Sequence, residues 1–131
     1  MTQKGQKMKI FINPSGFIEV HFFGEQDPAT ITRGIKTIES YAKKLQSQNK
    51  PILILEDVSK INYIDFLSPK MAGPRKEITQ AFAEIKFDRF AMCAPLYLQV
   101  ILTTIALVVG KRNQIKAFDS RIDAINWLLS K

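Results

Sequence analysis

The pattern of apolar and polar residues near the N-terminus predicts a β-hairpin. Two apolar segments, residues 8–12 and 17–23, flank the turn sequence Asn13-Pro14-Ser15-Gly16. The second segment alternates with a period of two, which is typical of a strand with one well-buried face. Proline presets one backbone angle of a turn and glycine permits a left-handed one, so this turn sequence suits a hairpin.

The rest of the chain alternates between helical and strand-like segments. Apolar residues at helical spacing predict helices over about 28–48, 74–85, 95–109 and 121–129, and short apolar runs at 52–55, 87–93 and 115–118 predict strands. The order is therefore ββαβαβαβα. This alternation predicts one α/β domain over residues 1–131, with a mixed, mostly parallel sheet of about five strands.

Residues 90–110 form a run of 21 residues without a charge, long enough to suggest a membrane span. We favour a buried strand followed by a buried helix, because Pro95 divides the run where a strand should end. The polar side chains of Gln99, Thr103 and Thr104 also interrupt the apolar character of the second half.

The predicted helix after Pro95 is apolar around most of its circumference. A helix of this kind needs more than one partner surface, and a sheet covers only one side. We therefore expect its main interaction surface to include Tyr97, Ile101, Ile105 and Val108. A second copy of the chain, a lipid or an anionic membrane surface would each cover it.

The amino-acid composition further limits the classes of function to consider. The chain has 19 basic and 12 acidic residues, a net charge of +7, but the basic residues are dispersed and carry no nucleic-acid-binding motif. One cysteine, Cys93, excludes an internal disulfide, and one histidine, His21, leaves no multi-histidine metal site. We expect no metal, no cofactor and no specific nucleic acid. The first residues lack the apolar core of a signal peptide, so we expect a cytoplasmic protein, with peripheral membrane binding as an option.

Two acids offer the strongest candidate chemistry. Glu56 and Asp57 follow the apolar run 52–55, at the predicted carboxyl end of the central strand, where open α/β sheets place their ligands. They could bind a cation or act as a general base, but capping a turn and pairing with a lysine is the simpler interpretation. A pocket beside them and a strongly shifted pKa would favour an enzyme.

Several segments resemble a known family. The sequence from Leu55 to Asp65 (LEDVSKINYID), together with the order ββαβαβαβα, resembles the STAS fold of anti-sigma-factor antagonists. The ending IKAFD at 115–119 and AINWL at 124–128 looks like the SpoIIAA-like branch, which includes sequences related to lipid-carrying CRAL-TRIO domains. The resemblance covers nearly the whole chain and implies a STAS or SpoIIAA-like fold.

One difference from the family bears on function. In its regulatory members, an aspartate after the central strand precedes Ser-Ser/Thr-Gly, and a partner kinase phosphorylates the second hydroxyl. Asp65 matches that aspartate, but Phe66 and Leu67 occupy the hydroxyl positions and Ser68 replaces the glycine. The resemblance therefore implies the fold without the phosphorylation switch.

The sequence leads us to expect a non-enzymatic binding or regulatory domain whose ligand is a protein partner, a lipid or a membrane surface. Its candidate sites are the helix surface defined above and a strand-end loop with Glu56, Asp57, Asp65 and Ser68. One alternative is a phosphorylation-regulated anti-sigma-factor antagonist acting on a regulatory protein partner. The other is an enzyme that uses Glu56 and Asp57.

Overall fold

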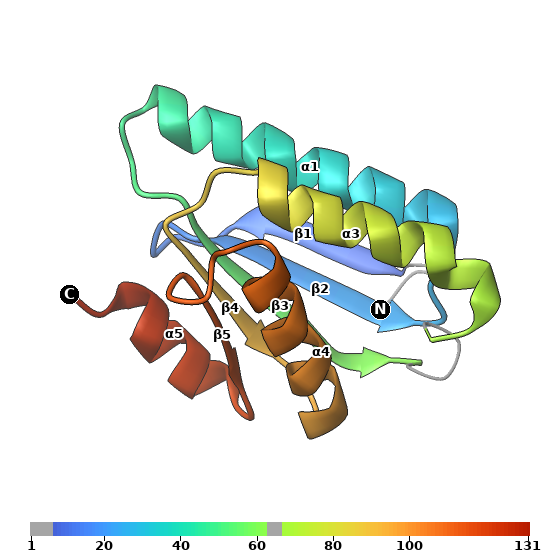
Figure 1. The fold of residues 1–131 in the computed structure, drawn as a ribbon. Coiled ribbons are helices and arrows are strands. Elements are labelled where there is room, and N and C mark those ends of the chain that lie inside the picture. The colour runs from blue at the N-terminus through green and yellow to red at the C-terminus, as the bar shows by residue number, and fades with distance from the viewer. Residues whose placement is uncertain (1–6, 63–66) are drawn as a thin grey trace, which may run out of the picture.

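A computed structural model describes residues 7–62 and 67–131, which fold into one sheet flanked by helices (Figure 1). The strands are β1 (Met8–Ile12), β2 (Ile18–Gly24), β3 (Leu53–Ile61), β4 (Arg89–Cys93) and β5 (Ile115–Phe118). The helices are α1 (Pro28–Ser47), α3 (Ala72–Glu84), α4 (Leu96–Val108) and α5 (Arg121–Leu129), with a short 3-10 turn η1 (Pro69–Met71) before α3. The predicted order ββαβαβαβα and the single α/β domain are confirmed.

The strands lie in the order β1-β2-β3-β4-β5. β1 and β2 form the predicted antiparallel hairpin, and every other neighbouring pair is parallel. Side chains alternate between the two faces of a sheet, so Glu56 and Asp57 in β3 point to opposite sides. The register places Val20, Glu56 and Met92 in one row across the sheet, and His21, Asp57 and Cys93 in the next.

In the described part of the chain, three helices cover one face of the sheet and one helix covers the other. α1, α3 and α4 bury the larger core, which includes Ile18, Ile54 and Leu102. α5 packs on the opposite face, where Leu55, Ala91 and Leu128 form a smaller core. In Figure 1, α1 and α3 run side by side above the sheet, while α4 lies apart from α1.

Local capping explains where two helices begin. The Asp27 carboxylate accepts a hydrogen bond from the Thr30 backbone N–H at 2.8 Å, and Pro28 occupies the first turn of α1. The Ser120 hydroxyl accepts one from the Asp123 N–H at 3.2 Å at the start of α5. Both starts follow the sequence prediction.

The central strand differs from its prediction. We expected it to stop near Leu55, with Glu56 and Asp57 at its carboxyl end, but β3 continues to Ile61. The added residues form a ladder with β2, in which Ile61 is opposite Gly24, whereas pairing with β4 ends at Asp57. Pairing with the backbone of β2 therefore extends β3 through its polar residues, and Glu56 and Asp57 lie within the strand.

Smaller differences affect element boundaries. The fourth strand begins at Arg89 and not at residue 87, and α3 begins at Ala72, just before the predicted Gly73-Pro74 start. The uncharged run 90–110 divides as predicted, since Pro95 separates β4 from the 13-residue helix α4. Within the described ranges 7–62 and 67–131, no helix has the length and apolarity needed to cross a bilayer.

Candidate functional site

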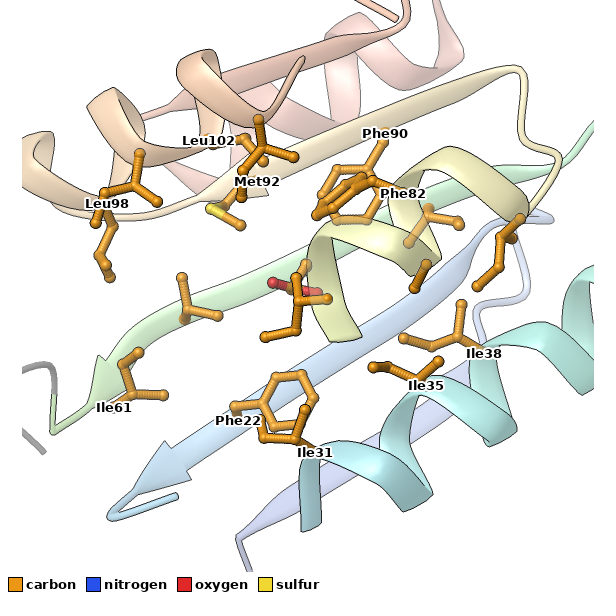
Figure 2. A pocket seen from close by; sticks show the side chains of 18 of the residues that line it. Phe22, Ile31, Ile35, Ile38, Ile61, Phe82, Phe90, Met92, Leu98 and Leu102 are labelled. Atoms are coloured by element: carbon orange, nitrogen blue, oxygen red, sulfur yellow. The ribbon is translucent and has the colours of Figure 1, made fainter. Parts of the chain in front are cut away.

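An internal cavity of about 110 Å³ lies between the sheet and the three helices α1, α3 and α4 (Figure 2). The sheet side is lined by Phe22 from β2, by Ile54, Glu56, Val58 and Ile61 from β3, and by Phe90 and Met92 from β4. The helix side is lined by isoleucines 31, 35 and 38 of α1, Ile78, Ala81 and Phe82 of α3, and Leu98, Ile101, Leu102 and Ile105 of α4. In Figure 2 the labelled side chains from both layers point toward a shared space.

The lining residues that are partly exposed indicate where the cavity meets the surface. Ile78 and Ala81 of α3 and Ile101 and Ile105 of α4 are partly exposed, whereas Leu98 and Leu102 are buried beneath them. Ile35 of α1, Glu56 and Ile61 of β3, and Ile85 after α3 are partly exposed as well. The cavity therefore opens to solvent on its helix side, where Ala81, Ile101 and Ile105 form part of the mouth, and Glu56 is itself only half-buried.

Aromatic rings close one end of the cavity. Phe82 of α3 packs edge-on against Phe90 of β4 with 4.7 Å between ring centroids, and Phe87 lies 5.8 Å from Phe90. Such edge-to-face contacts hold rings in fixed orientations. This end of the cavity is therefore a rigid, apolar wall.

Among the described residues that line the cavity, Glu56 is the one ionisable side chain. No described residue donates a hydrogen bond to its carboxyl group, and no described lysine or arginine pairs with it. Burial raises its pKa to about 7, and the neighbouring charge of Asp57 adds to the effect. Near neutral pH, Glu56 therefore exchanges between a neutral donor and an unpaired anion.

Gln26 supplies the second polar group of the lining. It is 2% exposed, and its Nε2 donates to the backbone carbonyls of Phe23 at 2.8 Å and Lys7 at 3.2 Å. These two bonds fix which end of the amide is the nitrogen. Its Oε1 is buried and accepts no hydrogen bond from any described residue. Gln26 thus holds a buried acceptor without a described partner, a group that usually finds one, but this oxygen is covered by surrounding atoms.

The opposite face of the sheet carries a separate charged cluster. Glu19 is 3% exposed, and its carboxylate accepts hydrogen bonds from Asn13 Nδ2 and Arg121 Nη2, both at 2.9 Å. His21 Nε2 lies 2.6 Å from Glu19 Oε2, and His21 Nδ1 lies 3.8 Å from Asp57 Oδ2. These contacts join α5 to the hairpin, so the cluster has a structural role.

Two further observations describe the reactive groups of the chain. Cys93 is buried, and burial, followed by the charges of Asp57 and Asp119, raises the pKa of its thiol, with Arg121 opposing the shift. A raised pKa disfavours the thiolate that a nucleophile needs. In the described part of the chain, no group of His, Cys, Asp and Glu side chains is arranged to hold a metal ion.

The residues of the predicted helix surface divide into two sets. Ile101 and Ile105 line the cavity, whereas Tyr97 and Val108 are 40% and 72% exposed. The solvent side of α4 also carries Leu96, Val100 and Leu107, all strongly exposed. A second copy, a lipid or a membrane as the cover of this side stays a prediction.

The predicted strand-end loop is not one site. Glu56 and Asp57 lie within β3 on opposite faces, and Asp65 lies outside the described residues. Ser68 precedes η1, and its backbone carbonyl accepts a hydrogen bond from Arg75 Nη1 at 2.9 Å. The structure therefore brings Glu56 together with the α4 isoleucines, a grouping that we did not predict.

Comparison with solved structures identifies the fold. An uncharacterised protein of the DUF3478 family from Shewanella loihica PV-4, described as having a SpoIIAA-like fold, superimposes with a TM-score of 0.65 and 15% sequence identity. The match covers 98% of both chains. This chain has the SpoIIAA-like fold.

The SpoIIAA-like fold confirms the family resemblance seen in the sequence at the level of architecture. No protein-family model matches this chain, and neither does any curated protein. At 15% identity the structural neighbour informs the fold alone. Function must therefore be argued from the cavity.

Proposed function

We propose that this chain is a non-enzymatic binding domain that holds one small apolar molecule in the cavity between the sheet and helices α1, α3 and α4. The observation that supports the proposal is the lining, which is apolar apart from Glu56 and Gln26. Ligand sites in proteins typically combine an apolar wall with a few polar groups that orient the ligand.

The size of the cavity suits a small ligand. An apolar cavity of about 150 Å³ stays dry and accepts a molecule the size of benzene. The volume here, about 110 Å³, is of the same order. A short alkyl chain or a single ring therefore matches the space.

Two alanines of α3 offer a matched test. Ala81 lines the cavity, whereas Ala83 on the same helix is exposed to solvent. We expect octan-1-ol to bind the wild-type protein and to shift the NMR signals of residues around the cavity. Ala81→Leu should fill the mouth and weaken octanol binding at least tenfold, and Ala83→Leu should leave it unchanged. Equal binding by both variants, or no binding by the wild type, would overturn the proposal.

The second candidate function is that of an enzyme, and one observation favours it. The carboxyl group of Glu56 lies beside a pocket and has a pKa of about 7, which suits a general base near neutral pH. Two facts argue for binding instead. Asp57 points to the other face of the sheet, and the described lining offers no second titratable group to complete a catalytic pair.

The regulatory alternative depends on phosphorylation. Leu67 lacks a hydroxyl, and Ser68 is one residue beyond the position used in the phosphorylated relatives that the sequence resembles. We therefore propose that the switch of those regulators does not operate here. Phosphopeptide mapping after incubation with kinases of the host is the test, and stoichiometric modification of Ser68 would favour the regulator.

A further inference from the structure

We propose that the ligand of this cavity is an apolar amine, whose ammonium group pairs with Glu56 and whose hydrocarbon body fills the space between α1, α3 and α4. This inference rests on the proposed function and names the chemical class of its ligand. It follows from the kinds of hydrogen-bonding atoms that the described lining residues leave unpaired.

The polar group of the lining that a ligand can reach is the carboxyl group of Glu56, which is half-buried and has no described hydrogen-bond partner. The amide nitrogen of Gln26 is used by the carbonyls of Phe23 and Lys7, which leaves Oε1 as an unpaired acceptor. When ionised, Glu56 offers two carboxylate oxygens that only accept. While Glu56 is ionised, a ligand that bonds to it must therefore bring a donor, and ammonium, amine and hydroxyl groups do so, whereas carboxylates, esters and ketones do not.

The charge of the cavity favours an amine over an alcohol as the ligand. The ionised Glu56 carboxylate is an anion in an apolar cavity, and no described lysine, arginine or histidine faces it from β2, β4, α1, α3 or α4. The one charge that acts on it is the neighbouring Asp57, which is also negative. An ammonium group supplies the missing cation, while a fatty-acid anion would meet repulsion from both acids.

The position of the acid also sets how many amino groups the ligand needs. Glu56 lies in the middle of β3, opposite Val20, and the aromatic wall of Phe82, Phe87 and Phe90 lies toward the start of the strands. Gln26 follows the end of β2, where Gly24 pairs with Ile61, five residues beyond Glu56 in β3. The Gln26 amide bonds to the carbonyl of Phe23, three residues beyond Val20, so it lies about 10 Å from Glu56 along the strands. One ammonium group reaches Glu56 alone, so a single amine is sufficient.

Three probes with the same hydrocarbon body test the inference: octylamine, octan-1-ol and octanoate. Because Glu56 ionises near neutral pH, octylamine should bind at least tenfold more tightly at pH 8 than at pH 5.5. Octanoate should show the opposite trend, and octanol should change little. At pH 8 the order of affinity should be octylamine, then octanol, then octanoate.

Matched variants assign the effect to Glu56. Glu56→Gln keeps the shape of the side chain and should abolish the pH dependence of octylamine binding. Asp57→Asn alters the neighbouring acid on the other face and should retain that dependence. The assignment of an amine as the ligand would be overturned if octanol bound at pH 8 as tightly as octylamine, or if Glu56→Gln left the pH profile unchanged. Either result would leave the proposed binding function standing. If no probe binds, the proposed function itself fails.

Discussion

The carboxyl groups of Glu56 and Asp57 belong to consecutive residues, yet they serve opposite faces of the sheet. Glu56 faces the apolar cavity under α1, α3 and α4. Asp57 faces the α5 side, where its Oδ2 lies 3.8 Å from His21 Nδ1 and its Oδ1 accepts hydrogen bonds from Ser59. One acid is thus without a described partner, and the other belongs to a polar network. The sheet separates what the sequence places side by side.

This separation predicts an unusual pH dependence of stability. The folded protein holds the Glu56 proton to about pH 7, whereas the unfolded chain releases it near the usual value of 4.5. The folded state therefore binds more protons between these values, and its stability falls as the pH rises through them. The loss should reach about 2 to 3 kcal/mol by pH 8, and urea unfolding at pH 5 and pH 8 measures it.

Two variants control this measurement. In Glu56→Gln the buried charge is absent, so the difference between pH 5 and pH 8 should shrink by the same amount and the variant should exceed wild type in stability at pH 8. Asp57→Asn retains an acceptor for Ser59 and should keep most of the wild-type difference. An identical pH profile for wild type and Glu56→Gln would contradict the placement of this acid.

The Glu19 cluster predicts a stabilising link between α5 and the hairpin. Burial alone would raise the pKa of Glu19, but hydrogen bonds from Arg121, His21 and Asn13 together lower it. Its stabilisation is complete above pH 4.5 and is lost as the pH falls through the lowered pKa. Arg121→Met leaves this carboxylate with one partner fewer and should cost about 1 to 2 kcal/mol in urea unfolding at pH 7.

A double-mutant cycle distinguishes the link from a general effect of losing an arginine. Glu19→Gln combined with Arg121→Met should cost less than the sum of the two single changes, because both remove the same interaction. The exposed Arg33 on α1 provides the comparison, and Arg33→Met should change stability by less than about 0.5 kcal/mol. Strictly additive losses at positions 19 and 121 would refute the link.

The fold could be predicted from the sequence because its signals are local. Helix α1 begins at Asp27-Pro28 and α5 at Ser120, and each start depends on a side chain that caps a backbone N–H within three residues. The break at Pro95 likewise follows from the ring of one residue. Signals of this kind can be recognised in the sequence without knowing which residues are neighbours in the folded structure.

The site could not be predicted because its signals are not local. Polar residues after Leu55 resemble the end of a strand, but pairing with β2 carries β3 on to Ile61 and puts Glu56 in the interior. Gln26 has no periodic pattern, and its role depends on carbonyls at Lys7 and Phe23. The cavity arises from how far α4 lies from α3, a spacing set by side chains of several elements together.

Lys111 provides a prediction about the closed end of the cavity. Its Nζ donates to the carbonyls of Phe82 at 2.7 Å and Ile85 at 3.0 Å, at the C-terminus of α3, and lies 4.5 Å from the centre of the Phe87 ring. Burial lowers the pKa of this amine. Lys111→Met removes both hydrogen bonds and the cation–π contact, and should lower stability by about 1 to 3 kcal/mol.

The next residue is the natural control for Lys111. Arg112 is exposed, so Arg112→Met removes the same charge without removing the contacts to α3. Thermal unfolding should show a lower midpoint for Lys111→Met and a nearly unchanged one for Arg112→Met. Equal shifts in both variants would mean that net charge, and not the cap on α3, determines the effect.

The buried thiol predicts slow chemical modification. Cys93 is 6% exposed, its Sγ donates to the Asp119 carbonyl at 3.9 Å, and burial raises its pKa. Alkylation requires both an accessible sulfur and a thiolate, so the native protein should react with iodoacetamide at least about tenfold more slowly than the urea-unfolded chain at pH 8. Asp119→Asn removes one of the charges that raise the pKa and should speed the native reaction by less than about tenfold, because burial is the larger cause. Mass spectrometry of the alkylated fraction over time gives both rates, and a native rate equal to the unfolded one would show that the sulfur is accessible.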